Sequence, residues 1–491
     1  MVKSLKSNSR QNCNNKGFSE NRTRANKINA STAYDTCTER LSPFGGLLAM
    51  IKFLDLIEFK QIFSAAYLAP NRKPKLGHYR MVIGLLMLLF IGFNRLWHFT
   101  YIRLDAMMCG FFRLDRLPVA STFWRYVDNM GINQGLSLIK MMNALRERVW
   151  KQLRLNYNSI DIDIDTTVKT IYGDQQGGRK GHNSQHRGKK GYRPVLCFIG
   201  QSREYLLGKL RKGKTMSGEQ IAAFIIQIKA SLPGCVQHVL LRADGEFFGR
   251  QSIKAAKHCG FDFIIANRRG EPPFNPDKWY RIKQYKNAQF NSCTYQPNGW
   301  DAPCRFVAMR IPKERQASNK SQPVQCPLFE DDQYTYRVFC TSLDGKAHVI
   351  IDQYDKRADV ENLVGEAKRE GLDAVPSAKF KNNYAFFQLV MLAYNIWRYM
   401  KLAAESAIAD KEDIQGLKGI ASNTIRIARL RLLFIAAKVV KDQNRDKVKY
   451  SIHDARTPSM FGFLKHLDFM RSKPRSWHQN AGWPQRFALT E

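Results

Sequence analysis

The chain has 491 residues, 44% of them hydrophobic, and 78 Lys and Arg against 42 Asp and Glu give it a net charge of +36. This length allows about three domains with sizeable cores, and so large a positive charge indicates a polyanionic partner such as nucleic acid. The longest apolar run, 81–93, is shorter than the roughly 20 residues that span a bilayer, and no secretory pattern opens the chain. These features argue against a membrane protein and predict a cytoplasmic one.

Ten cysteines are scattered along the chain, and no two of them form a Cys-x2-Cys pair. This spacing argues against a structural zinc site. Several of the cysteines lie within apolar stretches, which suits reduced thiols, so we expect no disulfides.

The N-terminal region has two parts. Residues 1–42 are rich in Asn, Ser, Lys and Arg, cannot bury enough apolar surface to fold alone, and are interpreted as a disordered basic arm that either contacts DNA or is a simple tail. Residues 43–155 have apolar residues at helical spacing. Within them, Ser121 or Thr122 can cap a short helix that carries Trp124 and Arg125. This pattern suits a helical DNA-binding domain that reads the major groove, or equally an ordinary helical subdomain.

The period changes at 159, where Ile and Asp alternate. The pattern predicts a strand with isoleucines on one face and Asp161, Asp163 and Asp165 on the other. Three carboxylates on one face repel one another unless cations accompany them. The strand therefore lines a metal-binding cleft or lies at a solvated edge, and either Asp165 or Asp163 is the candidate ligand.

The next segments predict an alternation of strands and helices. A glycine-rich basic loop, 173–191, is expected to follow DNA phosphates, and its His182 and His186 are poor candidates for a metal site because the glycines disfavour a helix. Further expected elements are strands at 194–200 and 204–210, a helix capped at Ser217, a strand at 236–241, a helix ending near 259 and a strand at 261–266. The strand at 236–241 leads into Asp244, past the end where α/β folds place ligands. Glu246 lies close by.

The segment 268–353 is expected to be a β-rich insertion with strands at 305–311, 334–342 and 348–351. Its Trp279 and Trp300 either stack on a flipped base or pack inside the insertion. An apolar helix is expected over 382–400, and the region 403–491 is basic and mostly helical, including an amphipathic helix at 425–440.

Between the insertion and the apolar helix, Tyr354, Arg357, Glu361 and Lys368 follow the spacing Tyr-x2-Arg-x3-Glu-x6-Lys. On a helix over 354–368 they fall on one narrow stripe. A carboxylate flanked by two cations and a phenol suits a site for both a metal and a phosphate, whereas the plainer interpretation is a surface helix with ion pairs.

This spacing resembles the Tyr-Arg-Glu-Lys signature of bacterial insertion-sequence transposases of the DDE type. The resemblance implies an α/β, ribonuclease H-like mixed sheet in a catalytic domain at 156–402, with the β-rich insertion before the last catalytic helix. It implies Asp165, Asp244 and Glu361 as catalytic residues and metal ligands. The bound metal would be two Mg²⁺ ions, with Mn²⁺ able to substitute.

The same resemblance implies DNA-binding roles that the residue types alone do not fix. Tyr354, Arg357 and Lys368 would bind the transposon end, and the helical domain with Trp124 and Arg125 would recognise the terminal inverted repeats. A homodimer in a synaptic complex, associated with the bacterial nucleoid, would cleave the ends through a hairpin and join the 3′ ends to target DNA. Two alternatives stay open from the sequence: a ribonuclease H-like nuclease without strand transfer, and a non-catalytic DNA-binding relative.

Overall fold

The computed structural model describes residues 28–181, 187–268, 272–313, 333–409 and 417–472, with the side chains of 408 and 409 excepted. The chain separates into a short unit up to Glu39 and a main unit that begins at Arg40. Most of the expected basic arm, 1–27, lies outside the described residues. The end of that arm is ordered, because Leu41–Ser42 forms the short strand β1, which pairs with β13 (Ala437–Asp442) of the C-terminal region.

The expected helical region is confirmed. Its apolar residues recur at helical spacing, and the seven α-helices bury them against one another. The helices are α1 (Leu47–Leu56), α2 (Phe59–Ala66), α3 (His78–Phe90), α4 (Phe99–Ile102), α5 (Ala106–Phe112), α6 (Ala120–Asp128) and α7 (Ile132–Gln152). The predicted cap is wrong, because α6 starts one residue before Ser121 and Val119 occupies the N-cap position. Trp124 and Arg125 lie exposed on this helix.

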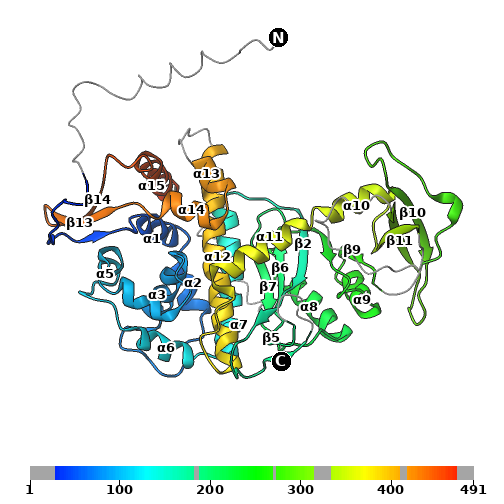
Figure 1. The fold of residues 1–491 in the computed structure, drawn as a ribbon, viewed down its shortest axis with the longest axis horizontal. Helices are drawn as coiled ribbons and strands as arrows, with labels where there is room; N and C mark the ends of the chain where they lie inside the picture. The colour runs from blue at the N-terminus through cyan, green and yellow to red at the C-terminus, as the bar shows by residue number, and fades with distance from the viewer. Residues whose placement is uncertain (1–27, 182–186, 269–271, 314–332, 410–416, 473–491) are drawn as a thin grey trace, which may run out of the picture. The chain divides into compact units, whose positions relative to one another are not determined.

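An eight-stranded mixed sheet forms the centre of the main unit, in the order β10-β11-β12-β9-β8-β2-β6-β7 (Figure 1). β2 runs parallel to β8, and β8 runs parallel to β9, whereas β2, β6 and β7 are antiparallel neighbours. The strands are β2 (Ser159–Thr166), β6 (Val195–Ile199), β7 (Tyr205–Lys209), β8 (His238–Ala243), β9 (Asp262–Ala266), β10 (Gln289–Tyr295), β11 (Cys304–Pro312) and β12 (Tyr334–Thr341). The expected strands of the catalytic region are therefore present.

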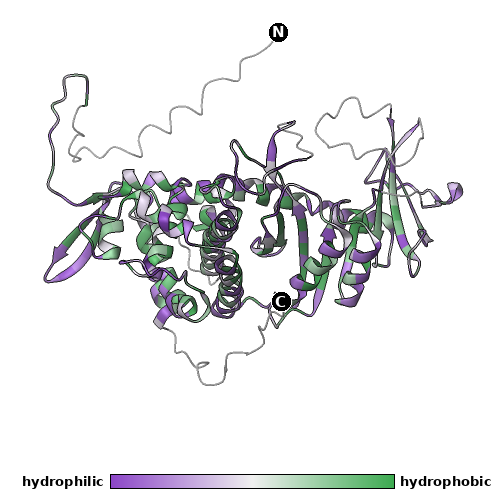
Figure 2. Ribbon diagram, turned by 90° about the horizontal axis from the view of Figure 1, so that it is seen from below, coloured by the Kyte–Doolittle hydropathy of each residue, from purple (hydrophilic) through white to green (hydrophobic). Residues whose placement is uncertain are grey.

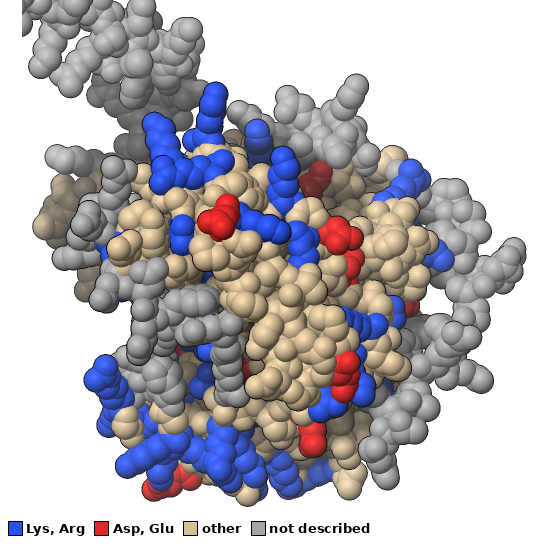
Figure 3. Space-filling view, turned by 90° about the vertical axis from the view of Figure 1, so that its right-hand side faces the viewer, with Lys and Arg blue, Asp and Glu red and all other residues tan. Residues whose placement is uncertain are grey.

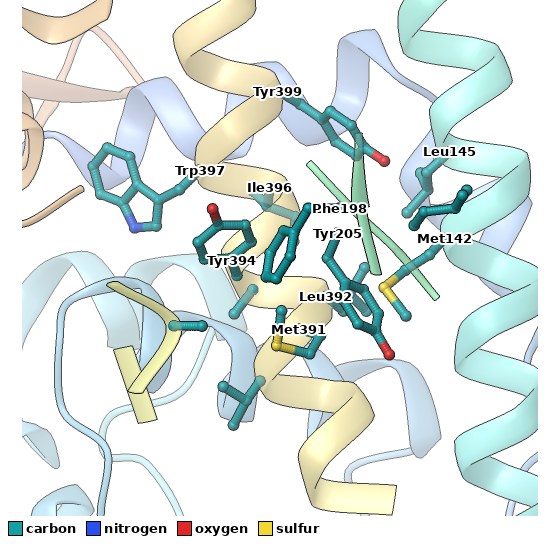
Figure 4. Close-up of a cluster of buried hydrophobic side chains, with 14 of the residues drawn as sticks. Met142, Leu145, Phe198, Tyr205, Met391, Leu392, Tyr394, Ile396, Trp397 and Tyr399 are labelled. Carbon is teal, nitrogen blue, oxygen red and sulfur yellow. The ribbon is translucent and has the colours of Figure 1, made fainter. Parts of the chain in front are cut away.

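Helices cover this sheet because most residues of its inner strands are buried. Figure 2 colours each residue of these strands and helices by its hydropathy. Helix α8 (Gly218–Ala230) begins with the predicted capping box, in which Ser217 accepts a hydrogen bond from the backbone N–H of Gln220. Helix α9 (Arg250–His258) packs against α8, and the long helix α12 (Phe380–Ala409) packs against α7 and β7. Figure 4 shows Tyr394 of α12 beside Phe198 of β6, with Met142 and Leu145 of α7 on the far side of Tyr205.

The insertion corrects one expected strand. β10, β11 and β12 form its β-rich part, but 348–351 belongs to helix α10 (Ala347–Asp355). The β-branched residues there resemble a strand, yet the helix buries Ala347, Ile350, Ile351 and Tyr354 along one side. Trp279 lies against the guanidinium of Arg310, 4.2 Å from its ring centre, which favours the packing interpretation of this tryptophan.

The C-terminal region is only partly helical. The helix expected at 425–440 is wrong, because α14 (Ile425–Leu432) ends early and β13 then pairs with β14 (Arg445–Tyr450) and with β1. The other elements are α13 (Leu417–Ser422) and α15 (Thr457–Ser472). Across the residues that the structure describes, every helix is too short or too polar to cross a membrane.

Candidate active site

The register of two parallel strands brings two aspartates to the same edge of the sheet. Ile164 of β2 lies opposite Ala243 of β8, so Asp165, the next residue of β2, and Asp244, the residue after β8, lie at the same end of these strands. Helix α11 (Ala358–Ala367) packs on β2 and carries Glu361 in its first turn, exposed to solvent. The fold thus brings together the three carboxylates that the sequence singled out.

The three carboxylates differ in their electrostatic surroundings, and those of Asp165 are the clearest. Burial, together with the like charges of Asp244 and Glu361, raises the pKa of Asp165 to about 6, although Arg357 acts to lower it. Only 17% of the Asp165 side chain is exposed. Such a group gains from any additional positive charge placed between the three carboxylates.

Arg357 is the positive group already present. Its guanidinium donates to the carbonyl oxygen of Ile164 at 2.9 Å and to Oδ1 of Asp165 at 3.1 Å. The side chain is buried, and although burial alone would lower its pKa, the charges of Tyr354, Asp165 and Asp244 raise the pKa of Arg357. Arg357 therefore holds the end of β2 and fixes the carboxylate of Asp165.

The four signature residues do not share one continuous helix, so that expectation is corrected. Tyr354 lies near the end of α10, Arg357 is the N-cap residue of α11, and Lys368 begins the π-helical turn η4 (Lys368–Leu372). Burial raises the pKa of Tyr354, whose ring packs on Phe339 with a centroid distance of 4.4 Å. The break lets Arg357 turn inward while Glu361 stays at the surface.

Asp244 is held by groups that the sequence did not reveal. Its Oδ1 accepts the backbone N–H of Glu246 at 3.0 Å, and its Oδ2 accepts a hydrogen bond from Arg268 at 3.2 Å. Arg268 follows the end of β9, the strand beside β8. Its position just past a central strand was the available signal for it.

Asp163, the alternative first aspartate, has a different environment. Arg242 of β8 forms two parallel hydrogen bonds to its carboxylate, at 2.8 and 2.9 Å, and the aspartate is 1% exposed. The same guanidinium lies 3.4 Å from the carboxylate of Asp161 and donates to the carbonyl oxygen of Gln353. On the face with three aspartates, Arg242 therefore compensates the charges of Asp161 and Asp163, and Asp165 lies at the more accessible end.

Glu246 is likewise committed to a partner. Its Oε2 accepts hydrogen bonds from the hydroxyl of Thr166 at 2.8 Å and from Arg193 at 2.5 Å. Since Thr166 directly follows Asp165 and Glu246 lies two residues after Asp244, this pair ties the two strand ends together. Glu246 therefore stabilises the positions of the two strand ends that carry the candidate carboxylates.

Two lysines, Lys368 and Lys169, contact segments of the chain that follow two of the candidate carboxylates in sequence. The ammonium of Lys368 donates to the carbonyl oxygen of Val168 at 3.3 Å. Lys169, in strand β3 (Lys169–Thr170), is fully buried and donates to the carbonyl oxygen of Ala374 at 2.6 Å. Burial lowers the pKa of Lys169 to about 7. Both lysines connect the segment after β2 with the segment after α11.

The predicted DNA-contacting residues of the helical region lie on a helix that touches the same segment. The indole N–H of Trp124 donates to the carbonyl oxygen of Pro376 at 3.2 Å, and Asp128 pairs with Lys379 at 3.2 Å. Arg125 is exposed beside Trp124. The structure thus places α6 against the chain that follows the carboxylate-bearing helix.

Asp165, Asp244 and Glu361 have the donor chemistry of a site for a hard divalent cation, because carboxylate oxygens are the ligands that Mg²⁺ prefers. Arg357 occupies one oxygen of Asp165, and no group of three potential ligands among the described residues is arranged around a common metal position. The donor types suit such an ion, and Arg357 is the counter-charge that lies against Asp165 in this structure. His182 and His186 lie outside the described residues.

An acidic centre in a strongly basic chain is typical of enzymes that cut or join nucleic-acid backbones. Figure 3 shows one face of the molecule, on which Lys and Arg are widely spread. Residues 26–471 match the model of the family described as "Transposase DDE domain group 1", and the chain belongs to this family. The protein is a DNA transposase, which cleaves DNA and transfers strands.

Comparisons with individual proteins give weaker likenesses. A piggyBac transposase synaptic complex with hairpin DNA matches with 12% identity and a TM-score of 0.38, over 79% of this chain and 80% of that one. A Mos1 transposase paired-end complex matches with 10% identity and a TM-score of 0.16, over 39% of this chain and 60% of that one. A comparison with curated proteins gave no match.

Proposed function

We propose that this transposase binds the terminal inverted repeats of its own element, cleaves the transposon ends and joins the 3′ ends to target DNA. In this proposal Asp165, Asp244 and Glu361 are the catalytic residues and hold two Mg²⁺ ions, for which Mn²⁺ can substitute. The observation that carries the proposal is the strand register that places Asp165 beside Asp244, with α11 and its Glu361 packed on the same strand β2. Neighbouring carboxylates repel one another, and a bound divalent cation relieves that repulsion.

The strand order supports a ribonuclease H-like catalytic domain over 156–402. The order β7-β6-β2-β8-β9 places an antiparallel trio beside two parallel strands, and α11 returns to the central strand β2. The first two carboxylates lie just past or at the ends of adjacent parallel strands, where α/β sheets place their ligands. The strands β10, β11 and β12 then form the insertion of this domain.

The bound ions would activate the attacking oxygen and stabilise the charge of the leaving oxygen. The chain's own residues hold and orient the groups around that chemistry. Arg357 fixes Asp165, Arg268 holds Asp244, and the pair of Glu246 and Arg193 joins the two strand ends. Rigid support of this kind keeps the reacting groups in line and lowers the barrier.

DNA contacts form the second part of the proposal. Lys368 offers a point charge to a phosphate beside the site. Tyr354 and Arg357, which lie deeper, also bind the transposon end in this proposal. Trp124 and Arg125, both exposed on α6, belong to the helical domain at 43–155 that reads the inverted repeats. Cleavage of two ends in concert calls for a homodimer in a synaptic complex.

The test is cleavage and joining of a labelled DNA fragment that carries the element's own ends, with Mg²⁺ present. Glu361→Gln should bind this DNA as the wild type does and lose both reactions. Asp359→Asn is the matched control, because Asp359 is another exposed carboxylate in the first turn of α11 and pairs with the surface residue Arg203.

Three results would separate the possibilities. Loss of chemistry in Glu361→Gln with activity kept in Asp359→Asn supports the proposed site. If the wild type cuts the DNA and yields no joined product, the reaction under these conditions is hydrolysis without strand transfer. Normal cutting by Glu361→Gln would remove that residue from the mechanism.

A further inference from the structure

A small, open depression lies beside the candidate active site, and the function proposed above does not use it. Its lining residues belong to the three-stranded sheet β3-β5-β4, the residues that adjoin it and the segment after β7. β5 spans Lys190–Tyr192 and β4 spans Arg179–Lys180. Three glycines and three basic residues contribute most of its lining: Gly181, Gly191, Gly213, Arg179, Lys189 and Arg193.

The glycines are required by the close approach of the backbone segments. A Cβ on Gly181 would lie 2.6 Å from the carbonyl oxygen of Gly213, and one on Gly213 would lie 2.5 Å from that of Gly191. A Cβ on Gly191 would lie 3.0 Å from the carbonyl oxygen of Lys169. Three backbone segments therefore touch without side chains between them, and a ligand can approach the main chain closely there.

The lining has one sign of charge. Among the described residues that line the pocket, three are basic and none is acidic. Arg179 and Lys189 are exposed at its rim, whereas the Arg193 side chain is only 16% exposed. Arg193 donates to Glu246 through one terminal nitrogen, and its buried Nε has no hydrogen-bond partner within the described part of the chain. A buried donor without a partner costs free energy that an anionic ligand can recover.

The pocket is joined directly to the carboxylate site. Val168, which also lines it, accepts the hydrogen bond from Lys368. Arg193 reaches the pair of Glu246 and Thr166, whose neighbours in the chain are the candidate aspartates. A DNA strand that places one phosphodiester at the carboxylates has a phosphate on either side of it, and the contacts above connect this basic pocket to the carboxylates.

We propose that this pocket binds a backbone phosphate of the DNA strand that is cleaved, close to the scissile phosphodiester. The inference rests on the proposed function for its location. The ligand is a phosphodiester anion, held by Arg179, Lys189 and Arg193 over the glycine floor. By fixing a phosphate beside the bond that breaks, the pocket sets which phosphodiester reaches the carboxylates.

The experiment measures binding of end-containing duplexes without divalent metal, so that cleavage does not contribute. Each duplex carries one uncharged methylphosphonate at a single position around the cleavage site. The test variant is Arg179→Gln combined with Lys189→Gln, because both residues are exposed and their replacement leaves the three glycines in place. Arg445→Gln combined with Lys449→Gln removes the same charge from the exposed face of β14 and serves as the matched control.

For the wild type, we expect one or two methylphosphonate positions next to the cleavage site to weaken binding by about fivefold or more. The test variant should bind the unmodified duplex more weakly and be insensitive to the modification at those positions. Its slope of log K against log salt should also become shallower by about 0.9 for each phosphate that the variant no longer neutralises. The control variant should keep the sensitivity of the wild type.

A test variant that responds to every methylphosphonate as the wild type does would overturn the pocket proposal. So would equal effects of the test and control pairs, because these would show a general dependence on charge. The outcome is distinct from that of the Glu361→Gln experiment. Normal cleavage by Glu361→Gln would remove Glu361 from the mechanism, and the methylphosphonate pattern would then report on DNA binding alone.

Discussion

Two aspartates on the same face of β2, two residues apart, have opposite environments. Asp163 is closed by two hydrogen bonds from Arg242 and is 1% exposed. Asp165 receives one hydrogen bond from Arg357, and the like charges of Asp244 and Glu361 act on it. A buried ion pair destabilises the fold when either partner is removed. A carboxylate at the end of a strand, with only part of its charge compensated, is suited to bind a cation. Position along one strand therefore separates a structural acid from a candidate catalytic one.

The largest expected effect comes from replacing Asp165, the less compensated of the two aspartates. Asp165→Asn should reduce DNA cleavage by roughly 10³-fold or more, because a metal ligand contributes several kcal/mol to stabilising the transition state. The melting temperature without metal at pH 7 should stay the same or rise. A carboxyl whose pKa is raised to about 6 in the fold loses stability as pH rises above its unfolded value of 3.8.

The measurements are initial cleavage rates and thermal unfolding on the same preparations. Asp163→Asn in the same assay gives the comparison. Cleavage by Asp165→Asn at the wild-type rate would transfer the role of first aspartate elsewhere on the strand.

The next largest effect comes from replacing Asp163, the aspartate paired with Arg242. Asp163→Asn leaves Arg242 buried without its full counter-charge, and removal of one partner from a buried pair costs about 3–5 kcal/mol of unfolding free energy. Denaturant unfolding should show this decrease, while the folded fraction should still cleave DNA. A stability equal to that of the wild type would mean that Asp161 and the carbonyl oxygen of Gln353 compensate Arg242 sufficiently.

A smaller effect concerns Lys169, which connects β3 to the segment after α11. Its folded pKa of about 7 lies below the ordinary value of 10.5, so the unfolded chain binds one proton more between these values. Stability therefore rises with pH from about 7 to about 10 in the wild type, by up to about 1.4 kcal/mol for each pH unit. Lys169→Met should lack this rise.

The measurement for Lys169 is the difference in melting temperature between wild type and Lys169→Met at pH 7, 8 and 9. The difference should move in favour of the wild type as the pH increases. A difference that is independent of pH would show that Lys169 stays protonated in the fold.

The sequence predicted the strands and helices wherever the period was long and regular, as in β2, α8 and the helices before 155. It failed at short segments whose structure depends on distant partners. Three of the four residues at 348–351 are β-branched, and their packing on the insertion makes them helical. The helix expected at 425–440 ends because β13 pairs with β1, nearly 400 residues away in the chain.

The candidate site was predictable in part for the same reason. Alternation placed Asp165 at the end of a strand, and the signature spacing singled out Glu361. The partners of these groups depend on register: Asp163 meets Arg242 because β2 and β8 pair in one particular alignment. No local pattern marks the break before Arg357 either, since neither Pro nor Gly occurs there.

The most direct measurement of the central comparison is Mn²⁺ binding by titration calorimetry, with Asp165→Asn and Asp163→Asn beside the wild type and no DNA present. If Asp165 and its two neighbouring carboxylates hold the ion, Asp165→Asn loses most of the Mn²⁺ affinity and folded Asp163→Asn keeps it. Loss of Mn²⁺ binding in Asp163→Asn with full binding in Asp165→Asn would contradict the assignment of the open aspartate as the metal ligand.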